Sequence, residues 1–221
     1  MKKIVIGLAM VSVLQLAFGE EPKKSAEDIA NDLWKASGGE EWANVQEARF
    51  SFVLQQKGKQ VLRADHIWNV PAKTDDVTWK DANGNEKHVK VNLADPGNSE
   101  DAKAAYARWA NDSDCLFSTL KLKDPGVQVK TEPRTEFEGF PCDPLRVSFE
   151  KASPSGGVRY VLYLDANSDA VRGWDYTPAN GAPIHSTWER YHNFGGFVLA
   201  TVQKATDKTI RFVDIQISMA K

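Results

Sequence analysis

The sequence contains few of the side chains from which catalytic and metal sites are usually built. Among its 221 residues are two cysteines and four histidines. His66, His88, His185 and His192 show no metal-ligand spacing such as H-x-x-x-H. His66 falls on the apolar face of an expected strand, where a hydrogen-bonded core histidine is more usual than a ligand. We therefore expect no metal site and no cofactor.

Runs of positive charge are also missing. The chain has 28 Lys and Arg residues against 30 Asp and Glu residues, and the basic residues do not cluster. This composition gives little support to nucleic-acid binding or to attraction by an anionic membrane surface. A chain of this length can bury a sizeable core without metal or disulfide support.

The first 19 residues, MKKIVIGLAMVSVLQLAFG, predict a secretory signal peptide. The basic pair Lys2-Lys3 precedes an apolar run, and Ala17-Phe18-Gly19 forms a small-x-small cleavage pattern. An uncleaved anchor is the alternative, but Gln15 interrupts the apolar run, which is short for a membrane span. We therefore expect a single domain over residues 20–221, periplasmic or secreted, with no stable membrane span after cleavage.

Two cysteines, Cys115 and Cys142, would enter an oxidising compartment after export. One disulfide and two separate buried thiols are both compatible with their spacing. The sequence does not decide between them.

The two-residue period of a strand is clearest in residues 158–176, VRYVLYLDANSDAVRGWDY. We expect this hairpin at the middle of one large antiparallel sheet. Its turn, Asp165 to Asp169, matches the opening of a calcium loop, but Ala170 stands where that loop needs glycine and Tyr176 where it needs glutamate. A polar hairpin turn is therefore the preferred interpretation.

Two segments have the period of a helix instead. The first is residues 25–36, which has Ser25 as its expected N-cap and ends before Gly38 and Gly39. Residues 99–111 follow a Ser99 cap, with Tyr106 and Trp109 on one face. The second helix opens an insertion between strands, residues 99–122, that we expect to cover an open end of the sheet.

These patterns predict an α+β fold with about ten strands in meander order. The expected architecture is a strongly curved antiparallel sheet, an incomplete β-barrel, covered by the N-terminal helix and the inserted helix. A sheet with one apolar face needs such a cover.

The order of parts resembles the LolA/LolB-like periplasmic lipoprotein carrier superfamily. The resemblance rests on Val45-Gln46-Glu47-Ala48-Arg49-Phe50 after a helix, the turn at Gly58, Trp68-Asn69-Val70-Pro71, and the hairpin arms YVLYLD at 160–165 and VRGW at 171–174. It implies a half-barrel whose concave apolar side holds lipoprotein acyl chains or other lipids. No Cys stands at the cleavage site, so the chain is similar to the soluble carrier rather than to the anchored receptor.

The first functional hypothesis is therefore a non-enzymatic exported protein that shelters a lipid, a lipoprotein acyl chain or another apolar ligand between sheet and helices. The expected pocket-lining residues are Phe50, Phe52, Leu62, Trp68, Trp109, Leu162 and Trp174. A cell-envelope interaction protein with the same fold and no ligand is the second. A glycan-acting enzyme that uses tryptophan platforms is the third, although the seven tryptophans are individually better explained as core residues.

Overall fold

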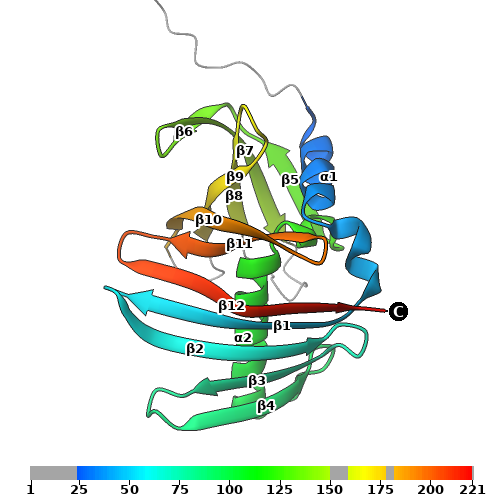
Figure 1. Ribbon diagram of the computed structural model, residues 1–221, viewed down its shortest axis with the longest axis vertical. Helices are drawn as coiled ribbons and strands as arrows, with labels where there is room; N and C mark the ends of the chain where they lie inside the picture. The colour runs from blue at the N-terminus through cyan, green and yellow to red at the C-terminus, as the bar shows by residue number, and fades with distance from the viewer. Residues whose placement is uncertain (1–23, 150–158, 178–181, 221) are drawn as a thin grey trace, which may run out of the picture.

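A computed structural model describes residues 24–149, 159–177 and 182–220. The predicted signal peptide lies outside these residues. One antiparallel sheet makes up most of the fold (Figure 1). Its strands are β1 (Val45–Gln56), β2 (Lys59–Asn69), β3 (Thr74–Lys80), β4 (Glu86–Asn92), β5 (Val127–Thr131), β6 (Thr135–Phe137), β7 (Phe140–Phe149), β8 (Arg159–Asp165), β9 (Val171–Thr177), β10 (Ile184–Phe194), β11 (Phe197–Lys204) and β12 (Lys208–Met219).

Within the described residues the sheet has 12 strands, so the prediction of about ten was too low. Apart from β6, which pairs with β7, the strand order is β4-β3-β2-β1-β12-β11-β10-β9-β8-β7-β5. In the described part of the chain β4 and β5 are therefore the two edges, and the curved sheet does not close (Figure 1).

Two meanders meet where the first strand pairs with the last. β1 and β12 run antiparallel, with Phe52 opposite Phe212. This long-range pairing places β12 and β11 near the middle of the sheet and moves the β8–β9 hairpin toward one end. The expectation that this hairpin lies at the middle was wrong, because local alternation does not reveal which distant strands pair.

The N-terminal helix α1 (Ala26–Ala36) forms as its caps predict. The Ser25 hydroxyl accepts a hydrogen bond from the Asp28 N–H at 3.1 Å, which satisfies a backbone donor that the first turn leaves free. Gly38, at φ 91°, provides the left-handed residue that ends the helix. The buried face of α1, including Ile29 and Leu33, packs toward η2 (Leu120–Lys123), β5 and β7.

The inserted helix α2 (Glu100–Phe117) continues past Asn111, where the prediction ended it. The reason is that Asp112, Ser113 and Asp114, which usually favour helix ends, are buried here. Asp112 bonds to His66 of β2, and Ser113 and Asp114 bond to Lys121 of η2. Tertiary contacts thus extend a helix that local sequence would stop.

Helix α2 runs across the strands on the inner side of the sheet and contacts β4 near its start and β11 near its end (Figure 1). Its 18 residues span about 27 Å at 1.5 Å per residue. Five strand spacings, from β4 to β11, span about 24 Å. The helix is therefore long enough to bridge the two meanders. No helix within residues 24–149, 159–177 and 182–220 is both long and apolar enough to cross a membrane.

Both cysteines are free and buried, so the alternative of two separate thiols holds. Burial, together with the negative charges of Asp112 and Asp114, raises the pKa of the Cys115 thiol well above its usual value. The thiol therefore stays protonated near neutral pH and is a poor nucleophile.

Gly173 of β9 is expected to tolerate no side chain. A Cβ atom there would lie 2.3 Å from the Ser186 carbonyl oxygen and 2.6 Å from the Phe137 ring. Gly173→Ala is therefore expected to lower the free energy of unfolding by about 1–3 kcal/mol, as overpacking does in other cores. Urea denaturation monitored by tryptophan fluorescence measures this loss, and an unchanged midpoint would contradict the tight packing of β9 against β10.

Candidate functional site

The seven predicted pocket residues lie on the inner side of the sheet or on α2, and all belong to one hydrophobic core. Leu62 is partly buried and packs against the core, and the other six are buried: Phe50, Phe52, Trp68, Trp109, Leu162 and Trp174. The structure therefore brings the set together on one side of the sheet. Contact of these residues with a ligand stays a prediction.

Aromatic side chains fill the space between the sheet and α2. Phe117 of α2 is 1% exposed. Its ring centroid lies 5.3 Å from that of Trp42, 5.6 Å from Phe50 and 6.0 Å from Trp68. These spacings are typical of packed aromatic pairs. The described interior at this point is a packed core.

None of the seven tryptophans, all of which lie in the described residues, is exposed. Trp34 and Trp42 are half-buried, and the rest are buried in the core. The interpretation of the tryptophans as core residues is therefore the better one. The glycan-enzyme hypothesis needs an exposed tryptophan ring as a flat surface for a sugar, and none of the seven provides one.

A buried polar cluster, formed by His66 of β2, Asp75 of β3 and Asp112 of α2, ties the helix to the sheet. His66 Nδ1 lies 2.7 Å from an Asp75 carboxylate oxygen, and His66 Nε2 lies 3.2 Å from an Asp112 oxygen. All three side chains are 0% exposed. The prediction that His66 is a hydrogen-bonded core histidine is confirmed.

The charge state of this His66 cluster follows from competing effects. Burial alone would lower the pKa of His66, but hydrogen bonds to Asp112 and Asp75, and their negative charges, outweigh burial and raise the pKa to about 9. His66 is therefore a cation near neutral pH, with both ring nitrogens donating. Because each nitrogen is engaged by a separate carboxylate, the ring has no free nitrogen for catalysis or for a metal.

Sequence reasoning missed the two acidic partners. Asp112 continues the apolar face of α2 that contains Ala105 and Trp109, and Asp75 alternates with the buried residues Val77 and Trp79. The signal that could have revealed these partners is an acidic residue on an otherwise apolar face. His66, on the apolar face of β2, was the matching signal on the opposite element.

The other candidate motifs have structural roles. The Asp165 side chain accepts hydrogen bonds from the Asn167 and Ser168 N–H groups at 2.9 and 3.1 Å and pairs with Arg172, so the polar turn replaces a calcium loop. Ser186 is buried and accepts a hydrogen bond from Trp174 Nε1, whereas His185 is exposed. Among the described residues no group of three or more His, Cys, Asp or Glu side chains is placed to hold a metal ion.

The described surface has a cavity of about 460 Å³ where α1 and η2 meet the edge strand β5, which we call the α1 groove. Its apolar lining is Ala30, Leu122, Val127 and Val129, and its polar lining is Glu27, Asn31, Lys123 and Gln128. The groove thus combines an apolar wall with polar side chains of both charges.

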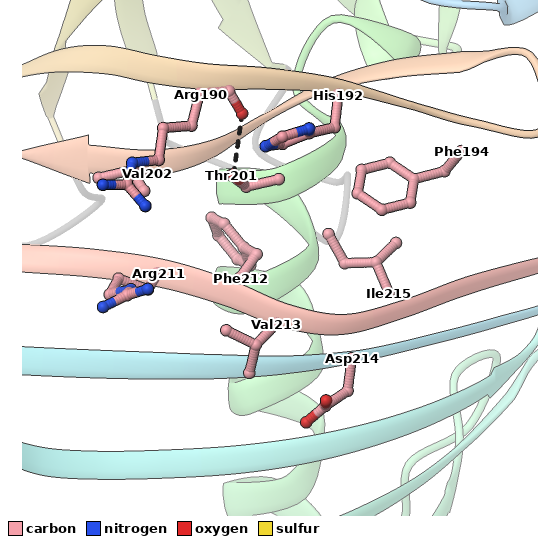
Figure 2. A pocket seen from close by; sticks show the side chains of 10 residues that line it. All are labelled: Arg190, His192, Phe194, Thr201, Val202, Arg211, Phe212, Val213, Asp214 and Ile215. Atoms are coloured by element: carbon pink, nitrogen blue, oxygen red, sulfur yellow. Dashed lines mark hydrogen bonds between the residues drawn. The ribbon is translucent and has the colours of Figure 1, made fainter.

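The second cavity, which we call the β11–β12 slot, has a volume of about 340 Å³. Figure 2 shows it between the β10–β11 hairpin and β12, with α2 behind. Its apolar lining includes Phe194, Val202 and Phe212, and arginines stand on both sides of it (Figure 2). Sequence reasoning identified neither cavity.

Three solved structures are similar to this chain over most of its length. A LolA superfamily protein from Nitrosomonas europaea matches with a TM-score of 0.51 and 8% identity, over 90% of this chain and 96% of that one. A putative outer membrane lipoprotein-sorting protein domain from Vibrio parahaemolyticus matches with a TM-score of 0.47 and 13% identity, over 89% and 93%. A DUF1329 family protein from Desulfovibrio piger also has a TM-score of 0.47, with 11% identity over 87% and 92%.

The chain therefore has a LolA-like fold, and the argument for it rests on the first of these likenesses. No protein-family model matches the sequence, and no curated protein matches it significantly. At such low identity the likeness defines the architecture and leaves the ligand open.

Proposed function

We propose that this protein is an exported, non-enzymatic binding protein that shelters a lipid or another apolar group in the α1 groove. The observation that carries the proposal is the cavity of about 460 Å³ beneath α1, at the edge strand β5. This volume falls within the range of small-molecule sites. The proposal includes a periplasmic location and a lipid or lipoprotein acyl chain as cargo, which the N-terminal pattern and the LolA-like fold support.

The α1 groove suits an apolar ligand better than the space behind α2. The described interior beneath α2 is packed with aromatic rings, and the buried His66 cluster holds that helix in place. Across the groove, by contrast, the described side-chain contacts between α1 and η2 include the hydrogen bond of Lys123 to Asn31 and the stacking of Lys123 on Trp34. These two contacts lie near the surface and are easier to displace than the buried apolar packing of Ile29 and Leu33, which holds α1 on the core.

The polar side chains of the groove fit a ligand with one polar end. Lys123 supplies a positive charge and Glu27 a negative one, while Leu122, Val127 and Val129 supply apolar surface. A fatty acid or an acylated peptide has this combination of an apolar body and a polar end. Burial of each methylene group contributes about 0.8 kcal/mol.

Mature protein, residues 20–221, is expected to bind the fluorescent fatty acid cis-parinaric acid saturably. Val129→Trp fills the groove and is expected to weaken binding at least about tenfold, equivalent to about 1.4 kcal/mol. Lys130→Trp is the matched control, because Lys130 is exposed and does not line the groove. Fluorescence titration measures both affinities. Absence of binding, or equal binding by the two variants, would contradict the proposal.

An interaction protein of the cell envelope without any ligand is the second candidate. The packed aromatic interior around Phe117 favours it, because a protein that stores no cargo needs no internal cavity. Native mass spectrometry of protein purified from its own host separates the two: a co-purifying lipid supports the carrier, and a bare chain supports the interaction protein.

A further inference from the structure

Strands β11 and β12 are neighbours in the sheet but pair over a short distance. Their register comprises Val202 with Arg211, Gln203 with Ile210 and Lys204 with Thr209. On its other side β12 pairs with β1 along its length, up to Met219. The described parts of the two strands thus separate beyond Val202 and Arg211, and the β11–β12 slot opens there (Figure 2).

Backbone conformation at Arg190 and Asp214 accompanies this separation. The described non-glycine residues with positive φ are Lys57, Lys73, Glu138, Asp169, Arg190 and Asp214. Arg190 and Asp214, both at φ 56°, lie within strands β10 and β12, whereas the other four lie in connections between strands. Each such residue costs about 1–3 kcal/mol, and such residues cluster at functional sites.

The two left-handed residues disturb the pairing on either side of the slot. At Arg190 the backbone carbonyl accepts a hydrogen bond from the Thr201 hydroxyl at 2.8 Å (Figure 2). Asp214 lies in a β-bulge, because the register between β1 and β12 shifts between Arg49 and Ser51. Bulges bend the strand that carries them, which separates β12 from β11.

Backbone hydrogen-bonding groups of β11 point toward the slot. The Val198 N–H donates to the Ser37 carbonyl at 3.3 Å, so the N–H of Val198 points away from β10. Because backbone direction repeats every two residues in a strand, the Ala200 N–H and carbonyl point to the same side, toward β12. One wall of the slot is therefore a strand edge.

The charges around the slot are mainly positive. Arg190 and Arg211 stand at the slot, and among the described residues neither side chain forms an ion pair. Asp214, the acidic residue of the lining, lies 2.8 Å from Arg63, which also pairs with Asp65. The lining has two arginines and one aspartate, so its net charge is positive, which complements an acidic partner.

We propose that the β11–β12 slot receives an extended peptide segment rich in acidic residues, which adds as a strand between β11 and β12. Main-chain hydrogen bonds to the strand edges provide affinity, and alternate side chains of the peptide meet the apolar wall and the arginines. An acyl chain has no groups that could pair with a strand edge, so the exposed edge favours a peptide. This inference concerns a different cavity from the α1 groove and stands independently of the lipid proposal.

The test uses a fluorescein-labelled peptide that alternates glutamate and valine, titrated with mature protein in a fluorescence anisotropy assay. Saturable binding is expected, at least about tenfold tighter than that of a peptide alternating lysine and valine. A glutamate–valine peptide with N-methyl groups on every other residue, which cannot pair as a strand, is expected to lose binding. No binding by the first peptide, or equal binding by the N-methylated one, would overturn the proposal.

Two variants locate the binding. Arg211→Glu reverses a charge at the slot and is expected to weaken the glutamate–valine peptide at least about tenfold, whereas Arg159→Glu reverses an exposed charge on β8 and is expected to leave affinity unchanged. Near-ultraviolet circular dichroism checks that both variants are folded. Equal affinity of the two variants would overturn the proposed location.

Hydrogen exchange distinguishes the peptide from a lipid in the same slot. Bound peptide is expected to protect the backbone amide of Ala200, which faces the slot, whereas the Val198 amide is already bonded to Ser37. Competition by cis-parinaric acid without this protection would show that the slot takes apolar chains and would overturn the peptide proposal. In the Val129→Trp variant peptide affinity is expected to be unchanged, so failure of the lipid proposal and failure of this one remain separate results.

Discussion

His66→Ala is expected to lower the free energy of unfolding by about 3–5 kcal/mol. The substitution leaves the carboxylates of Asp75 and Asp112 buried without their cation, and removal of one partner from a buried ion pair is strongly destabilising. It also releases the contact that fastens α2 to β2. Urea denaturation followed by tryptophan fluorescence measures the loss.

His88→Ala is the matched control. His88 contacts Asp76 near the surface of the β3–β4 hairpin, where such pairs contribute about 0–1 kcal/mol. A loss at His66 no larger than the loss at His88 would show that the buried cluster does not stabilise the attachment of α2.

The same cluster predicts that the protein is less stable in alkaline solution. The pKa of His66 is raised to about 9 from its ordinary 6.5, so its contribution is fully present below pH 6.5. It declines between pH 6.5 and 9 and is lost above that range, because the folded state then releases the proton that the unfolded state has already lost. The slope of stability with pH in this window is expected to flatten in His66→Gln. An equal slope in the two proteins would contradict this account.

Phe117→Ala is the second substitution with a large expected effect, about 3–5 kcal/mol. Phe117 is 1% exposed and contacts the rings of Trp42, Phe50 and Trp68, so truncation removes apolar contact and leaves a cavity between α2 and the sheet. Thermal and urea denaturation measure the effect.

Phe140→Ala provides the comparison for this substitution. Phe140 is 43% exposed and its ring is covered on one side by Arg172, so its truncation opens no internal cavity. A loss below about 1 kcal/mol is expected there. Similar losses at the two positions would mean that the aromatic cluster around Phe117 is loosely packed.

Much of the architecture could be predicted from local signals in the sequence. Alternation predicted the β8–β9 hairpin, and the Ser25 and Ser99 caps predicted where both helices begin. The end of α2 could not be predicted, because Asp112 stays helical through its contact with His66, far away in the sequence. The pairing of β1 with β12 could not be predicted either, because alternation identifies the two faces of a strand and not its partner strands.

Less of the candidate site could be predicted from the sequence. Alternation identified Phe50, Trp68 and Leu162 as members of one apolar face, but it does not indicate whether side chains or a ligand cover that face. The α1 groove includes polar residues such as Asn31 and Gln128, which have no distinctive pattern. The β11–β12 slot depends on the backbone conformation of Arg190 and Asp214, and neither residue type predicts a left-handed conformation inside a strand.

The pairing of β1 with β12 also affects how the protein folds during its synthesis. While the chain is being synthesised, β1 has its hairpin partner β2 but must wait for residues 208–219 before its other side is satisfied. An open strand edge is prone to pair with other chains, and contacts this distant in sequence form slowly. A chain that ends before β12 would therefore lack the strand pairing that joins its two meanders. During synthesis, the nascent chain would depend on chaperones until residues 208–219 are made.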